Sequence, residues 1–390
     1  MDLYDLANPV ERMLADKADA MRIPLGGTME LLPLCNMNCK MCYIRLTPSQ
    51  MRARGRMLSC GEWLRIAEEA KSASVLYLLL TGGEPLLYPE FERLYNTLFD
   101  MGFILTINTN GTLLDKRWAD LFAERPCKRI NVTLYGSDRE TYGRLCGNPD
   151  DFDRVMKAAR LLQERNLLFR FNCSVTSDNV GQLEAIAAIA RDFGVPLEPC
   201  SYMFPPVRRK EEATIYSRMT PKEAAKSQID SFVARAGVRN ISAGIQNTLR
   251  LIQSPEQIAD YAANPLSTGL TCRAGRSGFW MNWMGELLPC GMFDEPKISL
   301  LEHSFGECWD YIVSETAKIR SCPDCRLCPN RRLCKTCGAA CLAETGRFDG
   351  RPEYLCEMTD ELVRQLYRLA AEYRLDPWTD QSLDFSNEED

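Results

Sequence analysis

Short apolar runs alternate with amphipathic stretches over the first two thirds of the chain, and this alternation limits the folds open to it. The pattern predicts six strands, over residues 28–34, 75–80, 104–108, 129–134, 169–175 and 196–202, with helices between them after Ser59 and at 89–101, 115–125, 151–165 and 179–193. Repeated strand-helix units form a mostly parallel sheet with its helices outside. Six units are too few for a closed eight-stranded barrel, so we expect an α/β fold with a partial (β/α)6 TIM barrel.

The length of 390 residues exceeds that of a usual single domain. A later region has fewer long helices and many cysteines. We therefore expect five parts: an N-terminal segment (1–26), the barrel (27–235), a linker or bridging region (236–271), a cysteine-rich domain (272–356), and a C-terminal helix with an acidic tail (357–390).

Charge and hydropathy exclude several classes of partner. The formal net charge of -6 argues against nucleic acid, because nucleic-acid-binding surfaces carry a clustered excess of Lys and Arg. No apolar run approaches the roughly 18 residues that span a bilayer, and the acidic, amphipathic N-terminus does not resemble a signal peptide. We expect a cytoplasmic protein that binds neither nucleic acid nor membrane.

Cysteine is abundant and clustered: of the 18 cysteines, three fall between positions 35 and 42 and eight between 308 and 356. Reducing compartments keep thiols free, so disulfides are a poor explanation and metal is a better one. Cys35, Cys39 and Cys42 can bind three irons of a cubane, which leaves one iron open to a substrate or cofactor, whereas electron-transfer clusters use four thiolates. A structural zinc site is the alternative, but this spacing is not usual for zinc.

The segment Cys-x3-Cys-x2-Cys followed by Tyr43 resembles the hallmark of the radical S-adenosylmethionine (SAM) superfamily. The resemblance implies a 4Fe-4S cluster whose open iron chelates SAM, reductive cleavage of SAM to a 5'-deoxyadenosyl radical, and catalytic roles for Cys35, Cys39 and Cys42. Thr81-Gly82-Gly83-Glu84-Pro85 follows the second predicted strand and is similar to the family's glycine-rich motif that receives the methionine ammonium group. Glycine permits close backbone approach, and Glu84 could accept a charge-assisted hydrogen bond.

Further SAM contacts follow from the same resemblance. Asn108 and Asn110 are expected near the adenosine, Thr133 at the end of the fourth strand, and Arg144 near the carboxylate. The structural alternatives stay open: a turn for the Asn-Thr-Asn-Gly segment, a buried strand residue for Thr133, and a surface ion pair for Arg144.

The C-terminal cysteines resemble a SPASM domain, which carries auxiliary 4Fe-4S clusters. Cys272-x12-Gly285-x4-Cys290 matches the opening of that domain, but the next part carries one extra cysteine, so assignment among Cys322, Cys334 and Cys337 is ambiguous. The preferred grouping assigns Cys272, Cys290 and Cys341 to one cluster, whose open iron could bind substrate sulfur. The other cluster takes Cys325, Cys328, Cys334 and Cys356. Cys337 is a candidate eighth ligand. Zinc is the alternative, although the two Cys-x2-Cys pairs are closer than zinc ribbons require. The other thiols are expected to be buried and apolar: Cys60, Cys127, Cys146, Cys173, Cys200 and Cys308.

SPASM relatives act on peptides, so the resemblance implies a radical SAM oxidoreductase that modifies a peptide or protein. Cross-linking of a ribosomally made precursor through a thioether or carbon-carbon bond is preferred. Serine or cysteine oxidation, as in sulfatase maturation, is disfavoured because Gly291 stands where that group has an aspartate; cofactor maturation is a further alternative. An electron donor such as flavodoxin or ferredoxin is implied, and a separate leader-binding protein is considered, since 34 residues precede Cys35. A non-catalytic iron-sulfur or zinc module is the alternative of another class.

Overall fold

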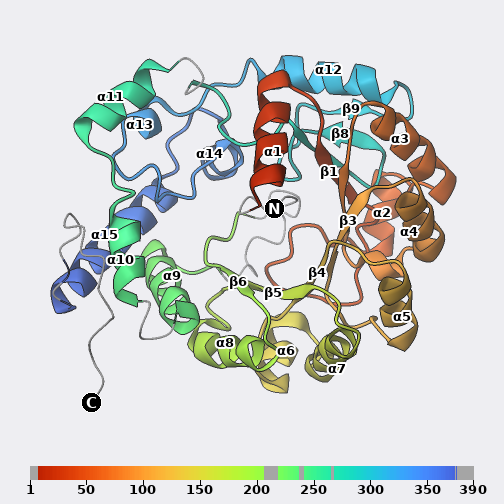
Figure 1. Ribbon diagram of the computed structural model, residues 1–390, viewed down its shortest axis with the longest axis horizontal. Helices are drawn as coiled ribbons and strands as arrows, with labels where there is room; N and C mark the ends of the chain where they lie inside the picture. Colours follow the sequence, from red (N-terminus) through yellow and green to blue (C-terminus); the bar gives the residue numbers. More distant parts are fainter. Residues whose placement is uncertain (1–7, 206–217, 237–240, 265–267, 374, 376–390) are drawn as a thin grey trace.

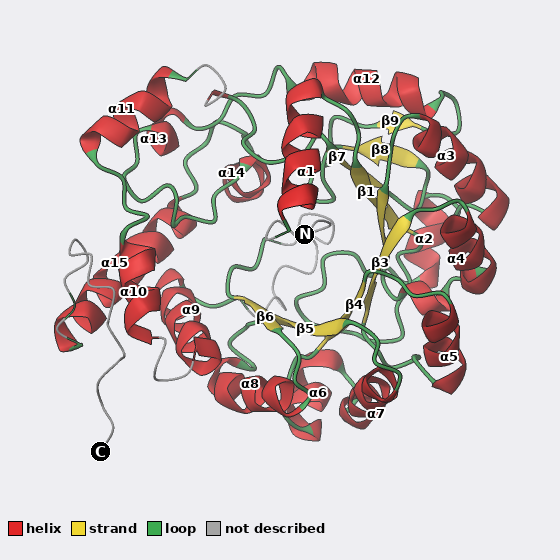
Figure 2. Cartoon of the chain, viewed as in Figure 1, coloured by secondary structure: helices red, strands yellow, loops and turns green. Residues whose placement is uncertain are grey.

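The computed structural model describes residues 8–205, 218–236, 241–264, 268–373 and 375. One nine-stranded sheet runs through it in the order β6-β5-β4-β3-β2-β1-β7-β8-β9. Strands β1 to β6 are all parallel, and β7 also pairs in parallel with β1. The sheet curves without closing, and the helices that connect its strands lie on its outer, convex side (Figures 1 and 2). The expected partial (β/α)6 barrel is confirmed.

All six predicted parallel strands form, with shifted ends: β1 Gly26–Glu30, β2 Tyr77–Thr81, β3 Ile104–Thr109, β4 Arg129–Thr133, β5 Phe169–Ser174 and β6 Leu197–Cys200. The predicted helices are α3 Cys60–Ser72, α4 Phe91–Asp100, α5 Lys116–Glu124, α7 Asp151–Glu164 and α8 Leu183–Asp192. Strand β1 ends earlier than the sequence predicted. Pro33 lies in the excess stretch and has no N–H for a ladder bond, which explains the difference.

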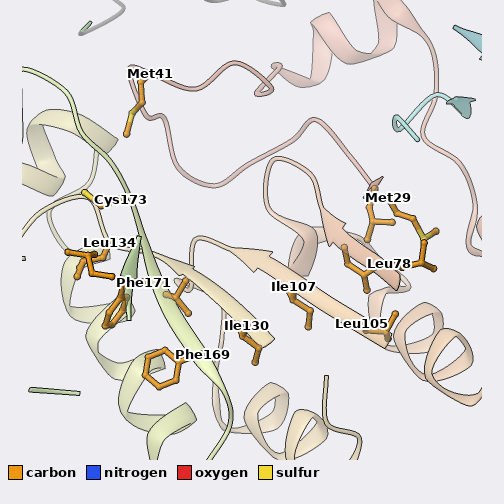
Figure 3. Packing of buried hydrophobic residues seen from close by; sticks show 14 of the residues in the cluster. Met29, Met41, Leu78, Leu105, Ile107, Ile130, Leu134, Phe169, Phe171 and Cys173 are labelled. Atoms are coloured by element: carbon orange, nitrogen blue, oxygen red, sulfur yellow. The ribbon is translucent and has the colours of Figure 1, made fainter. Parts of the chain in front are cut away.

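Between the sheet and the outer helices lies the main core. Along β5, Phe169, Phe171 and Cys173 are buried, while the alternate residues are only partly buried. Neighbouring strands contribute the same layer (Figure 3): Met29, Leu78, Leu105, Ile107, Ile130 and Leu134. Period-two alternation turns the other side chains of each strand to the concave face, so that face is polar and available for a site.

Some elements were not predicted from the sequence. Helix α1 (Pro9–Met21) packs its Ala15 and Ala18 against Leu25 and Tyr77, at the amino ends of β1 and β2. Strands β7 Gly278–Met281, β8 Glu286–Leu288 and β9 Ile298–Ser299 extend the sheet beyond β1. Smaller unforeseen helices are α2 Pro48–Arg54, α6 Arg139–Cys146, α12 Phe305–Thr316, α13 Pro323–Arg326 and α14 Gly338–Thr345, with the 3-10 turns η1 Pro85–Leu87 and η2 Val180–Gln182.

Beyond the barrel, helix α9 (Pro221–Ala236) packs on α15 (Glu353–Glu372), which is the expected C-terminal helix. The expected linker region contains α10 (Ile241–Leu249) and α11 (Pro255–Ala263). Helices α11, α13 and α14 lie across the molecule from β3 and α4 (Figure 1). The acidic tail, residues 376–390, is outside the described residues. A bilayer-spanning helix is absent from the part of the chain that the structure describes.

Candidate functional site

The loop that carries Cys35, Cys39 and Cys42 follows β1 and is anchored on the end of helix α6. The backbone N–H of Asn38 donates to the carbonyl of Cys146, and that of Lys40 donates to the carbonyl of Leu145, both at 3.0 Å. The last carbonyls of a helix lack partners within the helix, so the loop supplies the donors that they need. This places the three-cysteine loop over the carboxyl ends of the strands, where the sequence predicted it.

Backbone donors also point at the sulfur atoms of this loop. The N–H of Met37 lies 3.4 Å from Cys35 Sγ, and the N–H of Arg45 lies 3.3 Å from Cys42 Sγ. Hydrogen bonds to sulfur are among the features by which proteins tune iron-sulfur clusters. The Cys39 thiol hydrogen-bonds the buried thiol of Cys146, a contact that, with burial, raises the pKa of Cys39.

The donor set fits an iron-sulfur cluster by its chemistry, because it consists of three thiols on one loop with N–H groups aimed at two of them. Among the described residues, no three Cys, His, Asp or Glu side chains converge with the geometry of a metal site. Burial raises the pKa of Cys35 to about 12, which shows how strongly a lone thiolate is disfavoured there. Ligation by iron would offset that cost, since metal ligands are deprotonated.

The loop after β2 packs directly against the cysteine loop. The N–H of Gly83 donates to Leu32 at 2.7 Å, and that of Glu84 donates to Leu34 at 3.0 Å. A Cβ added at Gly82 would lie 2.6 Å from the Leu32 carbonyl oxygen. Pro85 is buried and begins the 3-10 turn η1 (Pro85–Leu87). The glycines are therefore required by the close approach of two backbones.

Glu84 is fully buried at this junction. One carboxylate oxygen accepts hydrogen bonds from the N–H of Leu86 at 3.1 Å and the hydroxyl of Thr109 at 2.8 Å, and the other accepts from the N–H of Asn110 at 2.8 Å. Burial raises the pKa of Glu84 to about 7, opposed by these three donors. The carboxylate thus joins the loops after β2 and β3, and a contact with an ammonium group remains a prediction.

Asn110 reaches the cysteine loop, as its expected place in the SAM site requires. Its amide nitrogen lies 2.9 Å from Asn36 Oδ1 and 3.5 Å from Cys35 Sγ. The orientation of the amide is determined, because its oxygen accepts from the N–H of Thr112 at 2.9 Å. Asn110 is therefore a donor beside Cys35 as well as a turn residue.

The remaining residues predicted to contact SAM each have partners within the protein. Asn108 accepts from Asn131 at 2.6 Å on the concave face of the sheet. Thr133 is half-buried, and its carbonyl lies 3.4 Å from the hydroxyl of Tyr142. Tyr43 packs against a small cluster of Ile44, Trp280 and Leu288.

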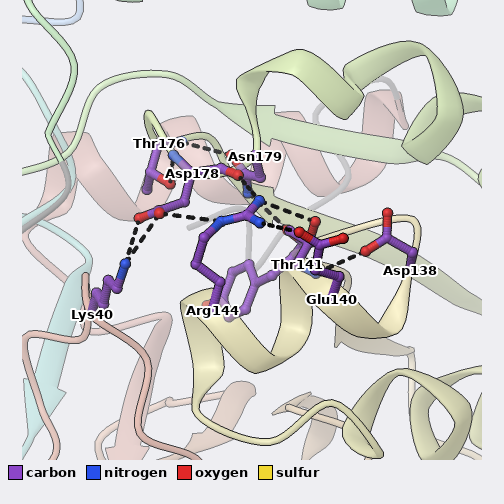
Figure 4. Close-up of polar contacts among 9 residues, drawn as sticks. Lys40, Asp138, Glu140, Thr141, Arg144, Thr176, Asp178 and Asn179 are labelled. Carbon is purple, nitrogen blue, oxygen red and sulfur yellow. Dashed lines mark hydrogen bonds and ion pairs between the residues drawn. The ribbon is translucent and has the colours of Figure 1, made fainter.

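Arg144 forms ion pairs, the alternative that the sequence left open. Its side chain is 41% exposed and lies near Glu140 and Asp178 (Figure 4). Asp178 also binds Lys40, which stands inside the three-cysteine loop. The sequence did not indicate that Cys146, Lys40 and Asp178 support this site. No local motif marks them, because each contacts a residue far along the chain.

Four C-terminal cysteines line one cavity of about 130 Å³ near α13 and α15: Cys325, Cys328, Cys334 and Cys356. These are the four residues that the sequence grouped together. The backbone N–H of Asn330 donates to Cys328 and lowers its pKa, against the larger raising effect of burial. The cavity therefore gathers a complete set of four thiols.

A second group of thiols lies around Cys290 and helix α14. The pKa of Cys290 is raised to about 11 by burial and then by the neighbouring charges of Cys272 and Cys337. Cys341 neighbours Thr336, Cys322 and Cys337. Cys337 is the N-cap residue of helix α14 and makes no side-chain cap hydrogen bond, whereas Cys341 is buried one turn later on the same helix. Cys337 therefore neighbours Cys272 and Cys290, Cys341 lies beside Cys337, and the ligand role of Cys341 stays a prediction.

The glycine of the Cys272-x12-Gly285-x4-Cys290 motif has a structural reason. Gly285 closes the hairpin between β7 and β8 with φ of 83°, in the left-handed region that favours glycine. Cys290 lies just after β8, which the hairpin leads into.

Most of the thiols expected to be buried are so. Cys60, Cys146, Cys173 and Cys308 are buried and Cys127 is partly buried. Cys200 is exposed at the end of the short edge strand β6, where fewer elements cover it.

Comparison with known proteins agrees with this geometry. Residues 29–181, from β1 to η2, match the radical SAM superfamily. The AdoMet-dependent heme synthase of Methanosarcina barkeri is 24% identical over 332 residues, 82% of this chain and 92% of that protein. The PqqA peptide cyclase of Granulibacter bethesdensis is 28% identical over 171 residues, 44% of this chain and 45% of that protein, so the chain spans less than half of the cyclase.

The fold is similar to that of Streptococcus suis SuiB bound to its precursor peptide SuiA, with a TM-score of 0.63 and 18% identity over 90% of this chain and 82% of SuiB. The matched region holds both the three-cysteine loop and the glycine-rich loop packed on it. Residues 29–181 are therefore a radical SAM domain, and the chain is an enzyme; that domain implies a 4Fe-4S cluster and S-adenosylmethionine.

Proposed function

We propose that this enzyme modifies a peptide, and that it cross-links a ribosomally made precursor with the help of two auxiliary iron-sulfur clusters. The observation that carries the proposal is the cavity beyond the barrel that is lined by four cysteines. A single radical SAM cluster needs none of them. The likeness to the PqqA peptide cyclase and to the fold of SuiB with its precursor peptide supports a peptide as substrate.

For the radical SAM cluster we propose Cys35, Cys39 and Cys42 as ligands. When bound, this cluster supplies the electron that cleaves S-adenosylmethionine. The chain's own part is to hold and shield the site: Gly83 brings the glycine-rich loop against the ligands, and Glu84 fixes the loop that carries Asn110. Further contacts with S-adenosylmethionine are proposed for Gly82, Pro85, Asn108, Thr133, Arg144 and Tyr43.

The auxiliary clusters are assigned by which thiols lie together. Cys325, Cys328, Cys334 and Cys356 would hold one cluster, since they share a cavity. Cys272, Cys290 and Cys337 would hold the other, with one iron open or ligated by a residue outside this group. Burial raises the pKa of Cys290, Cys328 and Cys337, and ligation by iron would offset that cost, because metal ligands are deprotonated.

Oxidation of a serine or cysteine side chain is disfavoured at this site. Gly291 follows Cys290 directly and is buried against Trp280, where a Cβ would lie 2.7 Å from the indole ring. Asp294 is nearby in sequence but exposed. No carboxylate therefore stands directly after this cysteine as a base.

A small-molecule substrate is the second candidate, because the match to the AdoMet-dependent heme synthase covers more of this chain than the match to the cyclase. The electron donor is proposed to be a flavodoxin or ferredoxin, and a leader peptide would be recognised by a separate protein or by the enzyme's own surface. The free state of all 18 cysteines suits the reducing cytoplasm.

The test begins with anaerobic purification and cluster reconstitution, followed by iron counting. Three 4Fe-4S clusters give about twelve irons per chain, and dithionite with SAM should release 5'-deoxyadenosine. Short cysteine-rich or aromatic-rich peptides encoded beside the gene should then lose two hydrogens in mass spectrometry. About four irons with bound zinc would refute the auxiliary clusters, and turnover of a porphyrin precursor without any peptide would favour the second candidate.

A further inference from the structure

The carboxylate of Asp178 connects two loops that are far apart in the sequence. Asp178 lies between β5 and η2. Both of its carboxylate oxygens accept from Lys40 Nζ, at 3.1 and 3.3 Å, and Arg144 Nε lies 3.5 Å from Oδ1. Arg144 Nη2 also donates to the backbone carbonyl of Asp178 at 2.8 Å (Figure 4). One residue therefore contacts the three-cysteine loop and the last turn of α6 together.

Asp178 is held in place by its own loop. Asn179 is buried and donates to the carbonyls of Tyr135 and Ser174, each at 2.9 Å, and accepts from the N–H of Thr176 at 2.8 Å. The N–H of Asp178 donates to the hydroxyl of Thr176 at 3.3 Å. The Asp178 side chain is 13% exposed. The Asp178 carboxylate is thus held by its own loop, and Lys40 and Arg144 bind to it.

The two acidic residues at this junction, Asp178 and Glu140, differ in how far they are buried. Lys40 and Arg144 share the half-buried carboxylate of Asp178, while the other acidic neighbour of Arg144, Glu140, is 88% exposed and 3.4 Å away. Exposed pairs contribute little, because water and salt screen them. The pairs with the partly buried Asp178 therefore contribute more to the geometry of this junction than the exposed pair with Glu140.

We propose that Asp178 is a positioning residue that sets the cysteine loop and Arg144 relative to each other for binding of S-adenosylmethionine. Lys40 stands between Cys39 and Cys42, so a shift of Lys40 moves the loop that carries these ligands. Arg144 is the side chain proposed for the SAM carboxylate. This inference rests on the proposed SAM site and adds the residue that couples its two halves.

Asp178→Asn removes the charge and keeps the shape, and Glu140→Gln is the matched control on the other side of Arg144. The readouts on reconstituted enzyme are iron content, melting temperature, and the Kd of SAM from the change it causes in the spectrum of the reduced cluster. Asp178→Asn should keep its iron and raise the Kd about tenfold, because charge-assisted hydrogen bonds are lost. Glu140→Gln should leave the Kd unchanged.

Lys40 supplies the second test. Lys40→Met should raise the Kd, Lys40→Arg should largely preserve it, and the double variant with Asp178→Asn should add little, since both remove one interaction. A Kd within about twofold of wild type in both Asp178→Asn and Lys40→Met would overturn the proposal. Wild-type enzyme that binds SAM but modifies no peptide would instead count against the proposed function and leave this inference standing.

Discussion

The close approach at Gly83 predicts that a single methyl group will displace the cysteine loop. A Cβ at this position would lie 2.2 Å from the Leu34 carbonyl oxygen and 3.1 Å from Cys35 Cβ. An ordinary contact begins at 3.4 Å, so in Gly83→Ala the two backbones must separate by about 1.2 Å. Neither can rotate away as a side chain would. Overpacking of this kind costs about 1–3 kcal/mol, and a displacement of about 1 Å can reduce a rate by about 100-fold.

The assay compares Gly83→Ala with Gly61→Ala. Gly61 lies in helix α3 with no atom within 4 Å of its added Cβ, so alanine there should leave stability equal or raise it by up to about 1 kcal/mol. Urea unfolding of the cluster-free protein measures the stability, and SAM-dependent release of 5'-deoxyadenosine measures the rate. Wild-type stability and rate in Gly83→Ala would refute the close-approach argument.

Three further changes test other parts of the structure. Thr109→Val removes a buried hydroxyl that donates at 2.8 Å to the carboxylate of the glycine-rich loop, and the free energy of unfolding in urea should fall by about 1–2 kcal/mol. Cys337→Ala should lose about four irons per chain in a colorimetric determination while Cys341→Ala keeps them; the reverse result would return Cys341 to the ligand set. Arg218→Met should lower the free energy of unfolding by about 2 kcal/mol, since the guanidinium pairs with a partly buried carboxylate and lies 3.5 Å from a tyrosine ring centroid. Lys226→Met removes an exposed ion pair and should change the free energy of unfolding by less than about 0.5 kcal/mol. Equal losses of stability in Arg218→Met and Lys226→Met would contradict the role given to burial.

Helix α6 shows where sequence periodicity is insufficient. It spans eight residues with Gly143 inside it, so its intrinsic helix propensity is low and its apolar pattern is short. Its stability depends on tertiary packing, with Tyr142 and Leu145 fully buried. Its free carbonyls in turn anchor the cysteine loop. A local reading of the sequence therefore missed the helix that supports the site.

The C-terminal cysteines also show how far the sequence alone can group residues that meet in the fold. The resemblance to a SPASM domain implied Cys325, Cys328, Cys334 and Cys356 as one set, and these four residues line one cavity although Cys356 lies 22 positions after Cys334. The choice between Cys337 and Cys341 as a ligand beside Cys272 and Cys290 stays a prediction, because both residues lie on the first turns of α14 and line the same cavity.

The sequence by itself determined the chemistry class and the architecture: the three-cysteine loop, the glycine-rich turn and the six strand-helix units are all encoded within short stretches, where local geometry and periodicity suffice. Only the tertiary structure decided which residues meet. Lys40 and Asp178 are 138 positions apart, and Glu84 and Thr109 are 25 apart. Such contacts arise because parallel strands bring the loops at their carboxyl ends to one edge of a curved sheet.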